Sequence, residues 1–226
     1  MLEENYRSIL STIPQGVRLV AVSKYKPVSD IEQVYRVGQR IFGENKAQEM
    51  RAKHAVLPSD IEWHFIGHLQ TNKIKYIAPY VSLIHSIDSM DLLREVNKAA
   101  AKCGRVIPCL LQFHIAQEQT KFGLDPEEAG RLLDSPEFQG MENVRIDGVM
   151  GMGSFTENKD QVRQEFASLR ATFENLRGRY FASCPHFKEI SMGMSDDYLL
   201  AIEEGSTLVR IGSSIFGARD YSLKTY

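Results

Sequence analysis

Short apolar segments alternate with amphipathic ones along nearly the whole chain, and this alternation constrains the fold more than any other feature. Eight segments have the length and apolar content of β-strands: Val17–Lys24, Arg40–Asn45, Ile61–Gly67, Ser82–Asp88, Val106–Ile115, Val144–Gly153, His186–Gly193 and Thr207–Gly217. The first and fifth hold nearly continuous apolar runs, which are typical of parallel strands covered on both faces. Eight strands that alternate with helices predict an α/β fold, a single (β/α)8 TIM barrel domain over residues 1–226. An open doubly wound sheet remains the alternative, because periodicity alone does not exclude it.

Helix signals fall between the strand candidates. Ser29 and Glu32 have the spacing of a capping box ahead of an amphipathic segment. Asp125 and Glu128 repeat the pattern, with a proline between them at the first helical position. An extra helix is expected within residues 1–14, before the first strand, because the apolar residues there have helical spacing.

The composition is ordinary for a soluble globular protein: of 226 residues, 43% are hydrophobic and 25% are charged. The formal net charge of −2 gives no overall basic field, so we expect no nucleic-acid and no membrane partner. The first residues lack the apolar run of a signal peptide, and no segment approaches the roughly 18 apolar residues of a membrane span. Three cysteines without paired spacing are typical of a reduced, intracellular protein. We therefore expect a cytoplasmic location.

Polar and glycine-rich residues gather at the carboxyl ends of the predicted strands. The residues of interest there are Lys24, Asn45, His64, Ser86, Met192, Ser195, Gly212 and Ser213. Because barrel proteins build their sites from the loops at these strand ends, we expect these residues to lie near one mouth of the barrel. His64, Ser86 and Met192 are assigned to the wall of the pocket.

Lys24 and Arg210 can each be interpreted in two ways. Lys24 ends an apolar strand, where it is either a lysine whose amine reaches solvent or a partly desolvated nucleophile that can form a Schiff base. Nothing local separates these interpretations. Arg210 lies between residues that should be buried, so its guanidinium should meet a carboxylate, a phosphate or an acceptor on a ligand. A structural salt bridge and a ligand contact are both open for Arg210.

Small residues and hydroxyls at two strand-to-loop junctions favour an anion site. Ser195 follows one strand candidate, and Gly212 with Ser213 lies at the end of another. Phosphate groups bind backbone N–H groups at such junctions, although a turn with a helix cap is the alternative for Ser195. His64 and His68 are four residues apart, but no cysteine or carboxylate completes a ligand set, so we predict no metal site.

Six short motifs follow the strand candidates in order. They are Ala-Val-Ser-Lys24, Phe-Gly-Glu-Asn45, Trp63-His64-Phe-Ile-Gly-His-Leu-Gln70, Gly148-Val-Met-Gly-Met-Gly153, Ser191-Met-Gly-Met-Ser195 and Val209-Arg-Ile-Gly-Ser213. With them the chain resembles the YggS/PROSC family of proteins that bind pyridoxal 5′-phosphate (PLP), also called PLP homeostasis proteins. Each motif is short, but six in the right order make a specific match, which runs from about Val17 to Arg219.

The resemblance implies the barrel of the alanine racemase N-terminal domain, which is PLP fold type III. It also implies that Lys24 holds PLP covalently as an internal aldimine, with Asn45 close to the ring and Arg210 facing the pyridine nitrogen. The phosphate-binding positions of the family correspond to Ser195, Gly212 and Ser213. One departure is Lys46, which stands where family members commonly have an aromatic residue.

The resemblance further implies a protein that buffers or delivers PLP inside the cell without an established turnover reaction, with PLP-dependent apo-enzymes as its partners. An arginine opposite the ring nitrogen disfavours protonation of that nitrogen and weakens the electron sink that PLP catalysis needs. In alanine racemase, a second base comes from a further domain and from the partner subunit. This chain ends nine residues after Gly217, so we expect no second domain, no enzymatic role and a monomer. The alternatives are a small fold-type-III racemase or decarboxylase, and a PLP-dependent regulatory interaction module.

Overall fold

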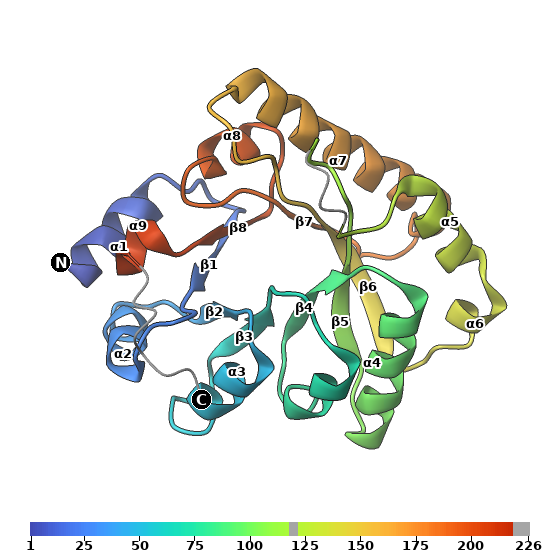
Figure 1. Ribbon diagram of the computed structural model, residues 1–226, viewed down its shortest axis with the longest axis horizontal. Coiled ribbons are helices and arrows are strands. Elements are labelled where there is room, and N and C mark those ends of the chain that lie inside the picture. Colours follow the sequence, from blue (N-terminus) through green and yellow to red (C-terminus); the bar gives the residue numbers. More distant parts are fainter. Residues whose placement is uncertain (118–121, 219–226) are drawn as a thin grey trace.

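Eight parallel strands form a closed barrel in the computed structural model, which describes residues 1–117 and 122–218 (Figure 1). Each strand is hydrogen-bonded to the strands before and after it in the sequence, and β8 pairs with β1 to close the ring. The strands are β1 (Arg18–Val22), β2 (Ile41–Glu44), β3 (Glu62–Phe65), β4 (Leu83–Ile87), β5 (Ile107–Gln112), β6 (Val144–Met150), β7 (Glu189–Ser191) and β8 (Leu208–Ile211). All eight lie within the segments predicted from the sequence. The (β/α)8 prediction is confirmed, and the open-sheet alternative is wrong.

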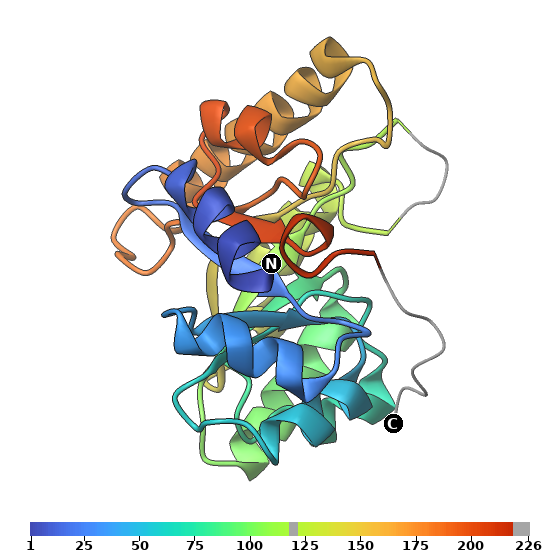
Figure 2. The same cartoon turned by 90° about the vertical axis from the view of Figure 1, so that its left-hand side faces the viewer.

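Helices lie around the outside of the strand ring (Figures 1 and 2). They are α1 (Leu2–Ser11), α2 (Val28–Arg36), α3 (Ala47–His54), the 3-10 helix η1 (Thr71–Tyr76), α4 (Met90–Lys102), α5 (Pro126–Asp134), α6 (Pro136–Gln139), α7 (Lys159–Tyr180), α8 (Tyr198–Glu203) and α9 (Ser213–Phe216). Within the described ranges, no helix has both the length and the apolar content that crossing a membrane requires.

Side-chain caps explain where several helices begin. Asp125 and Glu128 form the predicted capping box at the start of α5, with the Asp125 carboxylate accepting from the Glu128 N–H at 2.7 Å. Ser89 caps α4 by accepting from the N–H three residues further on, at 3.3 Å. The capping box predicted at Ser29 is wrong, because α2 begins at Val28 and Ser29 already lies inside its first turn. A proline with extended backbone occupies the N-cap position instead.

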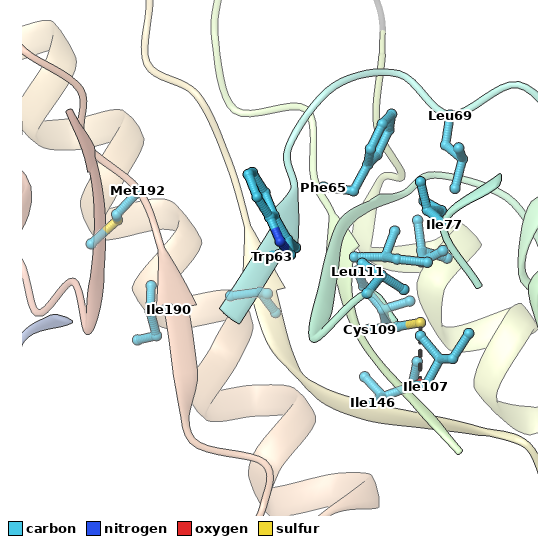
Figure 3. Packing of buried hydrophobic residues seen from close by; sticks show 14 of the residues in the cluster. Trp63, Phe65, Leu69, Ile77, Ile107, Cys109, Leu111, Ile146, Ile190 and Met192 are labelled. Carbon is cyan, nitrogen blue, oxygen red and sulfur yellow. Dashed lines mark hydrogen bonds between the residues drawn. The ribbon is translucent and has the colours of Figure 1, made fainter. Parts of the chain in front are cut away.

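Two hydrophobic layers hold the barrel together. Inside the ring, one small cluster of buried side chains contains Val20, Leu83, Leu110, Met150 and Leu208. A larger cluster fills the space between strands and helices, and Figure 3 shows part of it, with Phe65, Leu69 and Ile77 beside Leu111. The apolar inner cluster accounts for only part of the interior, because buried polar side chains also hydrogen-bond across the ring, from β4 to β7.

The N-terminal helix α1 lies against α9, the last helix that the structure describes (Figures 1 and 2). Asn5 Nδ2 donates to the Ile215 carbonyl at 3.2 Å, and the Tyr6 hydroxyl donates to Gln39 Oε1 at 3.2 Å. These contacts join the first helix both to α9 and to the segment that precedes β2.

Replacing Gly148 with alanine should strongly destabilise the barrel. Gly148 lies in β6 with a φ of +156°, and a Cβ atom there would lie 1.9 Å from the carbonyl oxygen of Glu189 in β7. The two strands would have to separate, which should lower the free energy of unfolding by about 3 kcal/mol. Urea denaturation of both proteins measures this change.

Gly178→Ala is the matched control. Gly178 lies inside α7, where a Cβ atom would meet nothing within 4 Å. The same substitution should there raise the free energy of unfolding by about 0.5–1 kcal/mol, because alanine is the better helix former. A Gly148→Ala protein as stable as the Gly178→Ala protein would contradict the close packing of β6 on β7.

Candidate functional site

Residues from three neighbouring strands meet at the carboxyl end of the barrel. Lys24 lies two residues after β1, Asn45 lies directly after β2, and Gly212 lies directly after β8. Because β1 pairs with both β2 and β8, these strand ends are adjacent. Gly212 packs closely on β1, since a Cβ atom at this position would lie 3.1 Å from the carbonyl oxygen of Val22. The closed ring therefore brings together residues from opposite ends of the sequence.

Lys24 is half-buried and lies in a tight turn. The Ser23 N–H donates to the Gly43 carbonyl at 3.0 Å, and the Lys26 N–H donates back to the Ser23 carbonyl at 3.1 Å. Lys26 Nζ also donates to the Phe216 carbonyl at 2.7 Å. These bonds tie the turn to β2 on one side and to α9 on the other, so the position of Lys24 is set by both neighbours.

Asn45 has a buried side-chain oxygen, Oδ1, with no hydrogen-bond partner among the described residues. Gly67 packs directly on this residue, since a Cβ atom at position 67 would lie 2.6 Å from the Asn45 carbonyl oxygen. A buried acceptor without a partner costs free energy, so this oxygen marks a place where a donor from a ligand is expected.

Arg210 lies within β8 and is only 4% exposed. Its Nη1 donates to Ser191 Oγ at 2.5 Å, and its Nη2 donates to the Gly151 carbonyl at 3.1 Å. Burial lowers the pKa of Arg210 to about 10, with nearby Asp197 opposing the shift, so the guanidinium is charged at neutral pH. No carboxylate within the described ranges forms an ion pair with Arg210, so the structural salt bridge finds no support there.

A line of hydrogen bonds continues from Arg210 across the inside of the ring. Ser191 Oγ lies 2.9 Å from His85 Nδ1, and His85 Nε2 lies 3.0 Å from His64 Nδ1. The line spans the barrel, because its residues come from β8, β7, β4 and β3. Burial lowers the pKa of His64 to about 3 and the pKa of His85 well below its usual value, so both rings are neutral at pH 7.

The proton positions along this line follow from Arg210. A guanidinium can only donate, so Ser191 accepts from it, and the serine O–H is then able to donate to His85 Nδ1. His85 in turn carries its proton on Nε2 and donates to His64 Nδ1, which assigns the tautomers from the hydrogen-bond network. This arrangement satisfies each link and places no second charge beside the guanidinium.

The candidate anion-binding residues lie at the start of α9 and in the loop after β7. The Gly212 N–H donates to Ser195 Oγ at 3.4 Å, and Ser213 is the first residue of α9. Asp197 Oδ1 accepts from the Met194 N–H at 2.5 Å, and burial raises the pKa of this carboxyl group. Asp197, the second of two acidic residues that follow Ser195, is therefore hydrogen-bonded to the backbone of the same loop.

The three residues assigned to the pocket wall lie in different surroundings. His64 belongs to the hydrogen-bonded line inside the ring. Ser86 is buried on β4, and its hydroxyl has no hydrogen-bond partner in the part of the chain that the structure describes. Met192 has no exposed surface and packs in the outer hydrophobic cluster near Ile190 (Figure 3). We therefore leave Met192 out of the proposed site.

Two surface cavities, of about 360 and 480 Å³, are lined by none of these residues. The smaller is lined by residues of η1, its preceding loop and the start of α4, and the larger by residues of α3, η1 and the loop after η1. Among the described residues, no three His, Cys, Asp or Glu side chains are grouped so that they could hold a metal ion.

Sequence reasoning missed most of the buried residues that support the site. Besides His85 on β4, it missed Glu44, Glu49 and Lys53, which form a buried ionic cluster beneath the Lys24 turn. The available signals were a glutamate at the end of an apolar strand and a Glu–Lys pair four residues apart in the helix that follows.

The chain is similar to known proteins over nearly its whole length. The family described as "Alanine racemase, N-terminal domain" matches residues 1–220. A pyridoxal phosphate homeostasis protein of Aquifex aeolicus (strain VF5) is 40% identical over 205 residues, which cover 90% of this chain and 88% of that protein. The pyridoxal phosphate homeostasis protein of Bos taurus is 40% identical over 218 residues, with 92% and 79% covered.

A solved structure shares both the fold and the sequence similarity. PipY of Synechococcus elongatus PCC7942, described as a COG0325 family member with PLP bound, superposes with a TM-score of 0.84 and 34% sequence identity. The match covers 96% of this chain and 100% of that chain.

His64→Gln should reduce the loss of stability of this protein in acid. Unfolded His64 takes up a proton below its ordinary pKa of 6.5, whereas folded His64 does so only near pH 3, so its contribution to the free energy of unfolding falls as the pH drops through this window. The free energy of unfolding, measured by urea denaturation, should fall between about pH 7 and about pH 5 in both proteins. This fall should be smaller in the variant by up to about 2 kcal/mol. Equal pH dependence in both proteins would contradict a neutral, buried His64.

Proposed function

The chain belongs to the family of pyridoxal phosphate homeostasis proteins, and on that premise we propose that it binds PLP covalently through Lys24 and keeps it available inside the cell. This membership confirms the resemblance drawn from the six sequence motifs. PLP is also the ligand that the description of PipY names.

The residues at the barrel mouth fit the three chemical groups of PLP. When bound, PLP supplies an aldehyde that condenses with an amine, and it also carries a ring nitrogen and a phosphate. Lys24 offers the amine, Arg210 offers a charged donor for the ring nitrogen, and Asn45 offers a buried polar group beside the ring. The proposed phosphate contacts are Ser195, Gly212 and Ser213.

The observation that carries this proposal is the state of Arg210. Its guanidinium is buried and charged, has no ion pair among the described residues, and is hydrogen-bonded to neutral groups. A buried cation in this state favours a further acceptor, and an unprotonated ring nitrogen is one. Lys24, in the turn that follows the strand paired with β8, supplies the second anchor.

The same arginine favours storage and delivery over turnover. A cation opposite the ring nitrogen disfavours its protonation, so carbanion chemistry on PLP is poorly supported. We therefore propose that the chain is not an enzyme and that its partners are PLP-dependent apo-enzymes, which receive the PLP released by Lys24.

Several finer properties stay predictions. We propose one PLP-binding domain over residues 1–226, with the helix in residues 1–14 as part of it, in a cytoplasmic monomer. A racemase or decarboxylase would instead convert an amino acid steadily and lose this activity on Lys24→Ala. A regulatory module would instead bind a partner protein only when loaded with PLP.

Borohydride treatment of the PLP-loaded protein should leave a pyridoxyl-phosphate adduct on the peptide that contains Lys24. Lys24→Ala should abolish the adduct, because the amine that forms the covalent link is gone. Lys98→Ala, which removes an exposed lysine of α4, is the control and should keep it. Peptide mass spectrometry reads the outcome, and an undiminished adduct in the Lys24→Ala protein would refute the covalent link.

Ser213→Ala should weaken the binding of PLP by about tenfold to hundredfold, because a hydrogen bond to a charged group contributes about 1.5–3 kcal/mol. Pyridoxal, which lacks the phosphate, is the matched control ligand, and its affinity should change little. Equilibrium titration by absorbance measures both affinities. Equal losses for the two ligands would place Ser213 away from the phosphate.

A further inference from the structure

Three ionisable side chains are buried together beneath the Lys24 turn. Glu44 is 0%, Lys53 is 1% and Glu49 is 2% exposed. Lys53 Nζ lies 2.7 Å from Glu44 Oε1 and 2.7 Å from Glu49 Oε1. Glu44 ends β2, whereas Glu49 and Lys53 lie four residues apart on α3, so the cluster joins a strand of the barrel to the helix that covers it.

The cluster bonds to the residues on both sides of Lys24. Lys53 Nζ donates to the Ser23 carbonyl at 2.8 Å, and the Tyr25 N–H donates to Glu49 Oε1 at 2.7 Å. The Ser23 hydroxyl adds a bond of 2.6 Å to Glu44 Oε1. The backbone before and after Lys24 is therefore fixed by buried, charged partners.

Tyr25 needs such a partner, because its backbone is strained. Its φ of +61° makes it the one described residue other than glycine with a positive φ. A non-glycine residue in the left-handed region costs of order 1–3 kcal/mol and persists only where the surroundings hold it. The bond from the Tyr25 N–H to Glu49 holds that conformation, which turns the chain directly after Lys24.

Stability alone is a poor reason for this cluster. Buried ion pairs are seldom more stabilising than apolar residues of similar size. Here two carboxylates share one ammonium, and Glu44 Oε2 and Glu49 Oε2 have no hydrogen-bond partner within the described ranges. Burying these charges costs free energy. Their hydrogen bonds fix the conformation of the Lys24 turn.

We propose that Glu44, Glu49 and Lys53 are positioning residues for Lys24, which hold its turn in the conformation from which the amine captures the aldehyde of PLP. The three side chains bond to the turn on either side of Lys24 and act through its backbone. The inference rests on the proposed role of Lys24 as the covalent anchor.

Lys53→Met and Glu49→Ala test the positioning role. Lys53→Met keeps much of the aliphatic stem, and Glu49→Ala removes the acceptor of the Tyr25 N–H. Each should slow capture of PLP by about tenfold to hundredfold, since a misplacement of about 1 Å can cost on the order of 10²-fold. Capture is followed by absorbance and by borohydride trapping at Lys24.

Glu165→Ala is the matched control for Glu49→Ala. Glu165 is a buried carboxylate that accepts from the Ser154 N–H at 2.7 Å, so its loss also frees a backbone donor, but in the loop after β6. It should leave the capture rate within about twofold, because the Lys24 turn is untouched. If Glu165→Ala slows capture as much as Glu49→Ala does, general destabilisation explains the effect and the positioning role is wrong.

Hydrogen exchange on the protein without PLP gives a second readout. The Tyr25 amide should exchange faster in Glu49→Ala and in Lys53→Met than in the wild type. Its exchange rate should be unchanged in Glu165→Ala. Should the first two variants fail to fold, Ser23→Ala removes only one bond to Glu44 and should give a smaller change in the same direction. Unchanged exchange at Tyr25 in a folded variant would contradict the proposal.

The pH profile separates positioning from packing. Burial raises the pKa of Glu44 to about 7, with Lys53 opposing and Glu49 adding to the shift, and Tyr80 is a further titratable group near it. The ratio of capture rates of Glu44→Gln and wild type should therefore change as the pH passes about 7, because only the wild type ionises at this position. Glu62→Gln, at an exposed position on β3, should give a constant ratio. A constant ratio for Glu44→Gln would contradict the positioning role of the cluster.

The outcomes separate this inference from the proposed function. If the wild-type protein captures no PLP at Lys24, the proposed function and the inference both fail. If the wild type captures PLP and the folded cluster variants do so at the wild-type rate, the inference alone fails.

Discussion

The pairing of β8 with β1 is the interaction on which the rest of the structure depends. It places Arg210 opposite Val20 in the register and brings Gly212 against the end of β1, beside the Lys24 turn. Opening the ring between β8 and β1 would leave both strands as edges and would keep these residues apart. Lys26 Nζ crosses the same seam to a carbonyl of α9 at 2.7 Å. The residues of the site are therefore adjacent only because the ring is closed.

The polar interior of the ring is a cost that the outer layer offsets. The apolar cluster inside the ring has few members, whereas the cluster between strands and helices runs around the barrel. A buried guanidinium, two neutral histidines and a serine occupy interior positions that hydrocarbon side chains would fill more favourably. Each is hydrogen-bonded, which limits the cost without removing it. Stability does not explain these groups, and under the proposed function they hold the charged guanidinium that faces the ring nitrogen of PLP.

The sequence predicted the parts of this protein that depend on local pattern. The eight strands follow from apolar periodicity, and the burial of Arg210 follows from its apolar neighbours in the chain. The start of α2 was mispredicted. Serine is a residue type that commonly caps helices, but Pro27 and not Ser29 occupies the N-cap position. The partners of Arg210 could not be predicted, because the contact between Ser191 and His85 depends on which strands face one another across a closed ring. The side of the sheet that Met192 faces could not be predicted for a related reason, since neighbouring residues at a strand end face opposite sides and a motif does not say which faces the mouth.

The hydrogen-bonded line beneath Arg210 and the ionic cluster beneath the Lys24 turn differ in charge. The difference suits the side chain that each one supports. The line beneath Arg210 is neutral, so it leaves the positive charge of the guanidinium available to an acceptor at the mouth. The cluster beneath the Lys24 turn has two carboxylates for one ammonium. An excess negative charge there would favour the protonated form of a nearby amine, which is not a nucleophile. Burial raises the pKa of Glu44 to about 7, so a proton on Glu44 removes this excess in about half of the molecules at neutral pH. The desolvation that makes the cluster costly thus also lowers its negative charge near neutral pH, while its hydrogen bonds on either side of Lys24 fix the backbone of the turn.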